Sequence, residues 1–295
     1  MKHIKFSFYY KIIVIIAIIA INNIAYAKTQ PLTITTGIIP IGSLVSMLNS
    51  NTDNEINVVL ANPNVSPHDS AINVKEMQAI KNSDVLILVS KNFEQEIIPN
   101  IDTTKTTVIY LDELLGVSQD YHFWLDTTMT QKILKVLAVE LGKIDPNNAK
   151  IFQSNALKYS SKIEGLKKEM QVDLSLVKNN FMVYHNAWNY FIRDNNLLKY
   201  YQGSITKENE HHHDIDTTLG VQDIIKLGED VKQKNIVCIL TEPQFEDSTI
   251  NNFIAKNHIR TAELNPIGKI TSPLADSYFL MMKENAKQLK SCVNI

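Results

Sequence analysis

Residues 84–112 read DVLILVSKNFEQEIIPNIDTTKTTVIYLD, and this stretch decides the fold class. Two short runs rich in β-branched residues, 84–90 and 106–112, have the composition of buried strands. The segment between them, 92–101, has an apolar spacing that favours a helix. Because strands that alternate with helices pair in parallel through crossover connections, this unit predicts an α/β protein.

The same alternation continues through most of the chain. Further strands are expected at residues 33–37, 56–61, 181–185, 199–205, 236–242 and 260–265. Helices are expected between and after them, at residues 41–50, 73–83, 186–197, 218–234, 247–258 and 277–292. Each half therefore contains four strands, and the predicted fold is two (β/α)4 Rossmann-like lobes.

The alternation stops between residues 126 and 178, where two helices are expected. The first covers residues 127–144, and the second begins near Pro146, a residue that suits a first helical turn. At 1.5 Å per residue, the second helix is expected to be on the order of 45 Å long. Such a helix is typical of a strut between lobes. The predicted division is a lobe at 28–145, a linker helix at 146–178 and a lobe at 179–295.

Residues 1–27 have the pattern of a secretory signal peptide. Lysines at positions 2, 5 and 11 flank the apolar run IIVIIAIIAI, and the segment ends in Ala25-Tyr26-Ala27. The run is too short to span a bilayer, which needs about 20 apolar residues. We expect cleavage after Ala27 and a mature protein in the periplasm.

Charge and cysteine content narrow the class further. The formal net charge of -2 offers no electrostatic attraction to nucleic acid, so no nucleic-acid partner is expected. Both cysteines, Cys238 and Cys292, lie in the exported part. Exported thiols tend to be oxidised, which favours a disulfide over two buried thiols.

Three histidines follow predicted strands. His68 lies after the strand that ends at residue 61, His122 lies after the one that ends near residue 112, and His185 ends the strand at 181–185. Ligands of open α/β sheets bind outside the carboxyl ends of the strands, so these imidazoles are expected to meet in the cleft between the lobes. Three imidazoles suit zinc and leave one tetrahedral position open.

The segments VSPHDS, YHFWLD, VYHNAWNYF, CILTEPQF and LNPIG occur in this order along the chain. With them the sequence resembles the metal-binding proteins of ABC importers of the zinc and manganese uptake type (ZnuA/TroA-like, cluster A-I), over nearly the whole mature chain. The resemblance implies two (β/α)4 lobes bridged by a rigid helix, with the ion at their interface. It implies that His68, His122 and His185 are the metal ligands, and that Cys238 pairs with Cys292.

Two positions depart from the family pattern. Many relatives have Asp in a Leu-Asp-Pro-Leu-Gly motif where this chain has Asn265, and an amide oxygen is a poorer donor to zinc than a carboxylate. The fourth position is therefore expected to hold water or a carboxylate not yet identified, with Asn265 nearby. The second departure is Ser90, where relatives commonly have Gly before a Glu; Glu94 occupies that acidic position, with a supporting role at most.

Residues 207–216 read KENEHHHDID. Adjacent histidines point in different directions on a regular backbone, so His211, His212 and His213 do not suit one pre-built site. Two interpretations remain open: an auxiliary loop that collects zinc near the cleft, or a solvated polar loop.

The resemblance and the ligand set together predict periplasmic capture of Zn2+ and its delivery to the membrane permease of a zinc ABC importer. Nitrogen-rich sites without carboxylates favour zinc over manganese, and manganese-specific relatives commonly have Glu at position 185. A manganese or broad divalent-metal binding protein is the nearest alternative. A secreted zinc hydrolase is the alternative from another class, but the chain lacks a His-Glu-x-x-His motif. A monomer without enzymatic activity is expected.

Overall fold

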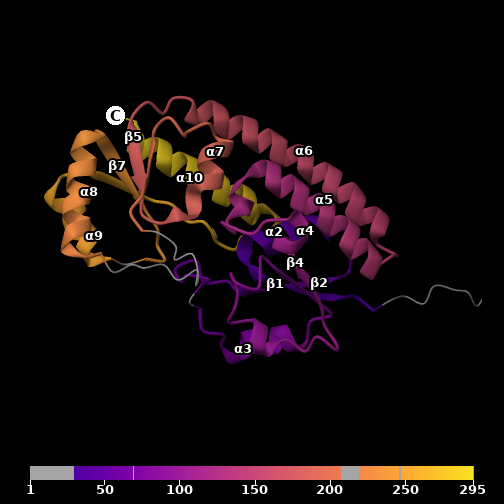
Figure 1. Cartoon of the computed structure of the whole chain (residues 1–295). Coiled ribbons are helices and arrows are strands. Elements are labelled where there is room, and N and C mark those ends of the chain that lie inside the picture. Colours follow the sequence, from indigo (N-terminus) through magenta and orange to yellow (C-terminus); the bar gives the residue numbers. More distant parts are fainter. Residues whose placement is uncertain (1–29, 69, 207–218, 246, 295) are drawn as a thin grey trace, which may run out of the picture. The chain divides into compact units, whose positions relative to one another are not determined.

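The eight strands of the described chain form two parallel sheets of four. The computed structural model describes residues 30–68, 70–206, 219–245 and 247–294. The first sheet contains β1 (Thr33–Ile38), β2 (Glu55–Leu60), β3 (Val85–Leu88) and β4 (Thr107–Tyr110). The second contains β5 (Asn180–Val183), β6 (Tyr201–Ser204), β7 (Ile236–Thr241) and β8 (Arg260–Glu263). The predicted α/β class with two parallel-sheet lobes is confirmed (Figure 1).

Both sheets have the same strand order. The orders are β2-β1-β3-β4 and β6-β5-β7-β8, with every neighbouring pair parallel. In each sheet the chain moves first to one side of the opening strand and then to the other, which creates a switch point beside β1 and another beside β5. Switch points at the carboxyl edge are where open α/β sheets bind ligands. The topology therefore predicts a ligand-binding position at the carboxyl edge of each sheet.

The helices cover and connect these sheets. Those of the first half are α2 (Ile39–Leu48), α3 (Val74–Lys81), α4 (Leu111–Leu115) and α5 (Thr127–Ile144). After the long helix α6 (Ala149–Leu174) come α7 (Asn189–Asp194), α8 (Val221–Gln233), α9 (Ser248–Lys256) and α10 (Ser277–Val293). Helix α6 has 26 residues, which makes it about 39 Å long. In chain order this long helix connects the strands of the first sheet to those of the second, and it is shorter than expected.

The prediction of a helix at residues 92–101 is wrong. This segment forms turns and a single 3-10 turn at Ile98–Asn100. The Oε2 atom of the Glu94 carboxyl group accepts hydrogen bonds from the backbone N–H of Val89 at 2.6 Å and of Ser90 at 3.4 Å, and it thereby holds the chain in a tight turn at the end of β3. Pro99 lacks the N–H that a continuing helix would need. Side chain–backbone bonds outweighed the helical pattern here.

One apolar core joins the two halves. It contains Leu86 of β3, Phe181 of β5 and Met282 of α10, all buried. Helix α10 packs on α2 and α6 as well as on β8, and α6 packs along α5 (Figure 1). A hydroxyl marks the same junction: Ser43 Oγ donates to Ala275 O and accepts from Tyr278 N, both at 3.1 Å. The C-terminal helix therefore anchors the second half to the first.

Cys238 of β7 and Cys292 of α10 form the predicted disulfide, with their Cα atoms 5.9 Å apart. The bond closes a sequence separation of 54 residues and attaches the last turn of α10 to the second sheet. On the chain-entropy account, a loop of this length stabilises the fold by about 4 kcal/mol.

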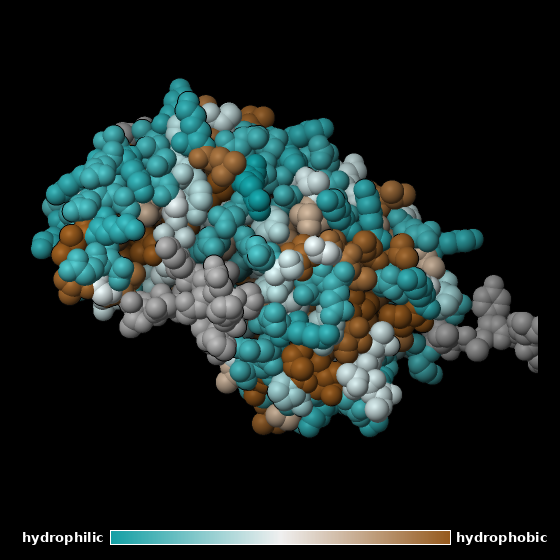
Figure 2. All heavy atoms as spheres, viewed as in Figure 1, coloured by the Kyte–Doolittle hydropathy of each residue, from teal (hydrophilic) through white to brown (hydrophobic). Residues whose placement is uncertain are grey.

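The surface seen in Figure 2 is mostly hydrophilic, with hydrophobic residues in smaller groups. Among the described helices, none has the length and apolar content needed to cross a bilayer. The expected signal peptide, residues 1–27, lies outside the described residues, and so does the segment 207–216.

Candidate metal centre

His68, His122 and His185 lie together, as the strand-end argument predicts. One ring nitrogen from each of them lies within 4.8 Å of the others. Their ring centroids are 5.7 Å (His68–His122), 6.1 Å (His68–His185) and 5.1 Å (His122–His185) apart. All three residues are buried, with at most 6% of each exposed. Three buried imidazoles this close form a set of donors that suits one metal ion.

Each histidine is delivered by a short turn beyond a sheet edge. His68 lies in the segment between β2 and α3, where Ser66 Oγ accepts from the His68 N–H at 3.2 Å. His122 directly precedes a 3-10 turn, Phe123–Leu125, which leads into α5. His185 directly precedes a second 3-10 turn, Asn186–Trp188, which leads into α7. The last two histidines thus occupy equivalent places before a turn and a helix.

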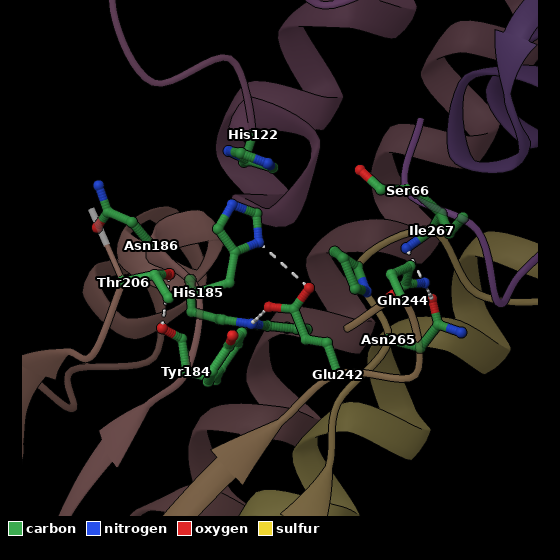
Figure 3. A network of polar contacts seen from close by, with 12 residues as sticks. Ser66, His122, Tyr184, His185, Asn186, Thr206, Glu242, Gln244, Asn265 and Ile267 are labelled. Atoms are coloured by element: carbon green, nitrogen blue, oxygen red, sulfur yellow. Dashed lines mark hydrogen bonds and ion pairs between the residues drawn. The ribbon is translucent and has the colours of Figure 1, made fainter. Parts of the chain in front are cut away.

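A carboxylate holds the ring of His185. Glu242, the residue after β7, lies with its Oε2 atom 3.2 Å from His185 Nδ1, and its Oε1 atom accepts from Trp188 Nε1 at 2.7 Å (Figure 3). Because a carboxylate only accepts, the imidazole carries its proton on Nδ1, which leaves Nε2 as the donor nitrogen. Carboxylate partners of this kind orient metal-binding histidines and raise their basicity.

His122 has an equivalent partner in Asp120. Its Nδ1 lies 3.1 Å from Asp120 Oδ1, while Asp120 Oδ2 accepts from Asn189 Nδ2 of α7 at 3.2 Å. Burial raises the pKa of Asp120, but the hydrogen bonds from His122 and Asn189 outweigh it and bring the pKa below its ordinary value. Sequence reasoning missed both carboxylate roles. The available signals were an acid two residues before His122 and another at the end of a predicted strand.

Aromatic rings form the walls of the site. Phe93 contacts His68 edge-on at a centroid distance of 4.5 Å. Trp124 lies 5.3 Å from His122, and Phe245 lies 5.2 Å from His185. Trp124 Nε1 donates to Pro266 O at 2.7 Å and so links the His122 turn to the second half. Apolar walls exclude water and strengthen electrostatic interactions within the site.

The space between the histidines is small. The cavity has a volume of about 10 Å³, which is the room that one water-sized particle needs. Its described lining comprises Ser66, Pro67, His68, Phe93, His122, Trp124, His185, Glu242, Gln244, Phe245, Pro266 and Ile267. A bare ion fits such a space, whereas a fully hydrated ion or an organic molecule does not.

Asn265 uses its side chain for structure. Its Oδ1 atom accepts from the backbone N–H of Ile267 at 3.1 Å and of Gly268 at 2.9 Å, and from Gln244 Nε2 at 3.0 Å. Its Nδ2 atom donates to Pro63 O at 3.1 Å. An aspartate could not make that last bond. Among the described residues, no carboxylate joins the three histidines within ligand distance.

Glu94 follows Phe93 in the chain and lies in the turn after β3. Its Oε2 atom accepts from the backbone N–H groups of Val89 and Ser90 at the end of β3, and the residue is 1% exposed. Burial raises the pKa of Glu94 to about 8, although the hydrogen bonds from Val89 and Ser90 oppose that shift. Its Oε1 atom packs so closely on Gly37 that no Cβ would fit there. Glu94 therefore positions the turn that carries Phe93.

The predicted auxiliary histidines, His211, His212 and His213, lie outside the described residues. The auxiliary-loop interpretation stays a prediction.

Comparison with known proteins identifies the family of the chain. The family model described as the periplasmic component A of the zinc-uptake complex (ZnuA) matches residues 34–292. The chain belongs to this family. The high-affinity zinc uptake system protein ZnuA of Brucella suis is 30% identical over 176 residues, which are 59% of this chain and 50% of that protein.

Two further similarities extend the comparison. The zinc-binding lipoprotein AdcA of Streptococcus pneumoniae is 23% identical over 259 residues, 79% of this chain and 50% of that protein. The chain therefore spans about half the length of both relatives. A crystal structure of ZnuA matches with a TM-score of 0.75 and 20% identity, covering 90% of this chain and 100% of the other. That match shows the shared fold.

Proposed function

We propose that this protein captures Zn2+ in the periplasm with high affinity and delivers it to the membrane permease of an ABC importer. The observation that carries the proposal is the convergence of His68, His122 and His185, with their donor nitrogens within 4.8 Å in a buried cavity. Relatives whose names describe zinc uptake and zinc binding support it. The three histidines are the proposed ligands of the transported ion.

Zinc is the favoured cargo over manganese. The three proposed ligand atoms are imidazole nitrogens, and no described carboxylate completes the group. Manganese sites favour oxygen donors, whereas imidazole suits zinc. The carboxylates of Asp120 and Glu242 bond instead to the Nδ1 side of two rings, where they balance the charge of the ion without binding it.

The cavity favours cargo binding over catalysis. A zinc hydrolase needs room for both an organic substrate and a reactive water beside the ion. The space of about 10 Å³ holds only one water-sized particle. Zinc must therefore shed its hydration shell on entry, and its ligands then shield it from solvent. The family is one of transport components, which agrees with this role.

The domain division supports capture by limited motion. We propose lobes at residues 28–145 and 179–295, joined by the helix of 146–178, in a monomer whose signal peptide is removed after Ala27. Helix α6 packs on α2, α5 and α10, so it contacts elements from both halves. Such packing restricts opening to small movements, enough to admit or release an ion.

Titration of the mature chain with zinc tests the proposal. We expect the metal-stripped protein from Lys28 onward to bind one tight zinc ion in a competition assay, and His185→Ala to bind far more weakly. His258→Asn is the matched control, because His258 is exposed and Asn tolerates its positive φ of 52°. Full zinc affinity in His185→Ala, tighter binding of manganese, or esterase or peptidase turnover by the zinc-loaded protein would contradict the proposal.

A further inference from the structure

Gln244 lines the cavity with an amide whose orientation is determined by its neighbours. Its Nε2 atom donates to Pro63 O at 2.6 Å and to Asn265 Oδ1 at 3.0 Å. Pro63 O can only accept, and Asn265 Oδ1 already accepts two backbone N–H groups. A flipped amide would place oxygen against both acceptors. The nitrogen must therefore face Pro63 and Asn265, and Figure 3 shows Gln244 beside Asn265.

The other end of this amide is not engaged by the described part of the chain. Gln244 Oε1 is buried and accepts no hydrogen bond from any described residue. A buried acceptor left unsatisfied destabilises the folded protein, so such an atom needs an explanation. Gln244 is part of the same cavity wall as the three histidines. An ion held by those histidines would provide the missing partner.

Among the described residues of the cavity wall, the other side-chain oxygens already have hydrogen-bond partners; Ser66 Oγ, for example, accepts from the His68 N–H at 3.2 Å. The two oxygens of Glu242 bond to His185 and Trp188. Asn265 Oδ1 accepts three N–H groups. Because the cavity has room for only one particle, a zinc ion there leaves little space for an additional water. A protein oxygen is the simplest occupant of the fourth tetrahedral position.

We infer that Gln244 Oε1 is the fourth ligand of the transported ion, an inference that rests on the proposed zinc site. Each half then contributes two ligands: His68 and His122 from the first, His185 and Gln244 from the second. All four ligands are neutral. The carboxylates of Asp120 and Glu242, which contact the Nδ1 atoms of His122 and His185, balance the charge of Zn2+. An amide oxygen binds zinc more weakly than a carboxylate, which suits an ion that must later be released.

The same side chain joins the metal to the contact between the halves. Pro63 belongs to the segment that leads to His68, and the bond from Gln244 Nε2 holds that segment against the second half. Binding of zinc to Oε1 immobilises the amide, which in turn fixes the bond to Pro63. Metal capture and approach of the two halves thus share one residue.

Two substitutions test whether Gln244 binds the metal or only contacts Pro63. Gln244→Leu removes both amide atoms, and we expect zinc affinity to fall at least about tenfold, the lower end of what loss of a partner costs at a metal site. Gln244→Glu keeps an oxygen but loses the donor to Pro63. We expect it to recover zinc affinity relative to the Leu variant and to raise manganese affinity by about tenfold or more, because carboxylates suit manganese.

The control is Gln233→Leu, the same change at an exposed position of α8, which should bind zinc like the wild type. If both Gln244 variants weaken zinc binding equally, or if neither does, Gln244 is not a ligand. A zinc-bound crystal structure of the wild type gives a second readout that requires no variant to fold. It should show Oε1 at about 2.0–2.2 Å from zinc, and a water in that place would overturn the inference. If the wild type itself does not bind zinc, the proposed function is refuted instead.

Discussion

Asp194 accepts hydrogen bonds from both the backbone N–H and the hydroxyl of Thr127, at 3.0 and 2.6 Å, although 67 residues separate the two. Thr127 begins α5, directly after the turn that follows His122, and Asp194 ends α7, directly after the turn that follows His185. Lys167 of α6 binds the same carboxylate at 2.6 Å. This contact therefore fixes the distance between the turns that carry the proposed ligands His122 and His185.

Asp194→Asn should destabilise the metal-free protein by roughly 3 kcal/mol, because it leaves Lys167 without its buried partner. Urea unfolding of the metal-free protein measures the change. The matched control is Asp230→Asn, which breaks the more exposed i,i+4 pair with Lys234 and should cost about 0.5 kcal/mol or less. Equal effects of the two substitutions would show that the Asp194 contact adds no more than a surface pair.

Glu242→Gln should weaken zinc binding by about 10- to 100-fold, since the amide no longer enforces the Nδ1–H form of His185. Competition with a chromogenic chelator measures the affinity. Glu263→Gln is the control, because Glu263 of β8 is exposed and acidic but bonds to none of the histidines. Unchanged affinity in Glu242→Gln would mean that packing alone orients the ring.

Glu94 should make the stability of the metal-free protein fall with rising pH. Its pKa is raised from 4.5 to about 8 in the folded state, so folding favours the protonated carboxyl. Below pH 4.5 the contribution of Glu94 to the free energy of unfolding is fully present. It is lost as pH rises toward 8, by roughly 1.4 kcal/mol per unit of pKa shift.

Glu94→Gln removes that titration. The stability of the variant relative to the wild type should therefore increase between pH 4.5 and 8 and level off beyond. Urea unfolding of both proteins across this range measures the difference. A difference that stays constant with pH would show that Glu94 ionises normally in the folded protein. Glu96→Gln, the same change at an exposed position two residues away, is the control.

The double substitution Cys238→Ala/Cys292→Ala should lower the free energy of unfolding by about 4 kcal/mol, because the unfolded chain regains the freedom that the disulfide removes. Reduction of the wild type should have a similar effect, measured by thermal unfolding with and without reductant. The double variant should not respond to reductant. A small loss in both cases would mean that the core between β7 and α10 holds without the bond.

Local patterns predicted most of the secondary structure. Helix α5 spans residues 127–144 as expected, since Asp126 caps it with bonds to two backbone N–H groups and its apolar spacing is regular. All eight strands form close to their expected places. The failure at residues 92–101 has a local cause of another kind: the Glu94 carboxyl group accepts hydrogen bonds from backbone N–H groups that precede it. Hydrophobic periodicity cannot report such a bond.

The sequence by itself determined the α/β alternation, the two sheets, the disulfide and the placement of three histidines at strand ends, because these follow from periodicity, residue type and chain order. Only the tertiary structure decided which side chains surround the histidines. Asp120, Glu242 and Gln244 gain their roles from contacts made across sheet edges and between the two halves. Such contacts depend on packing in three dimensions, which no local pattern encodes.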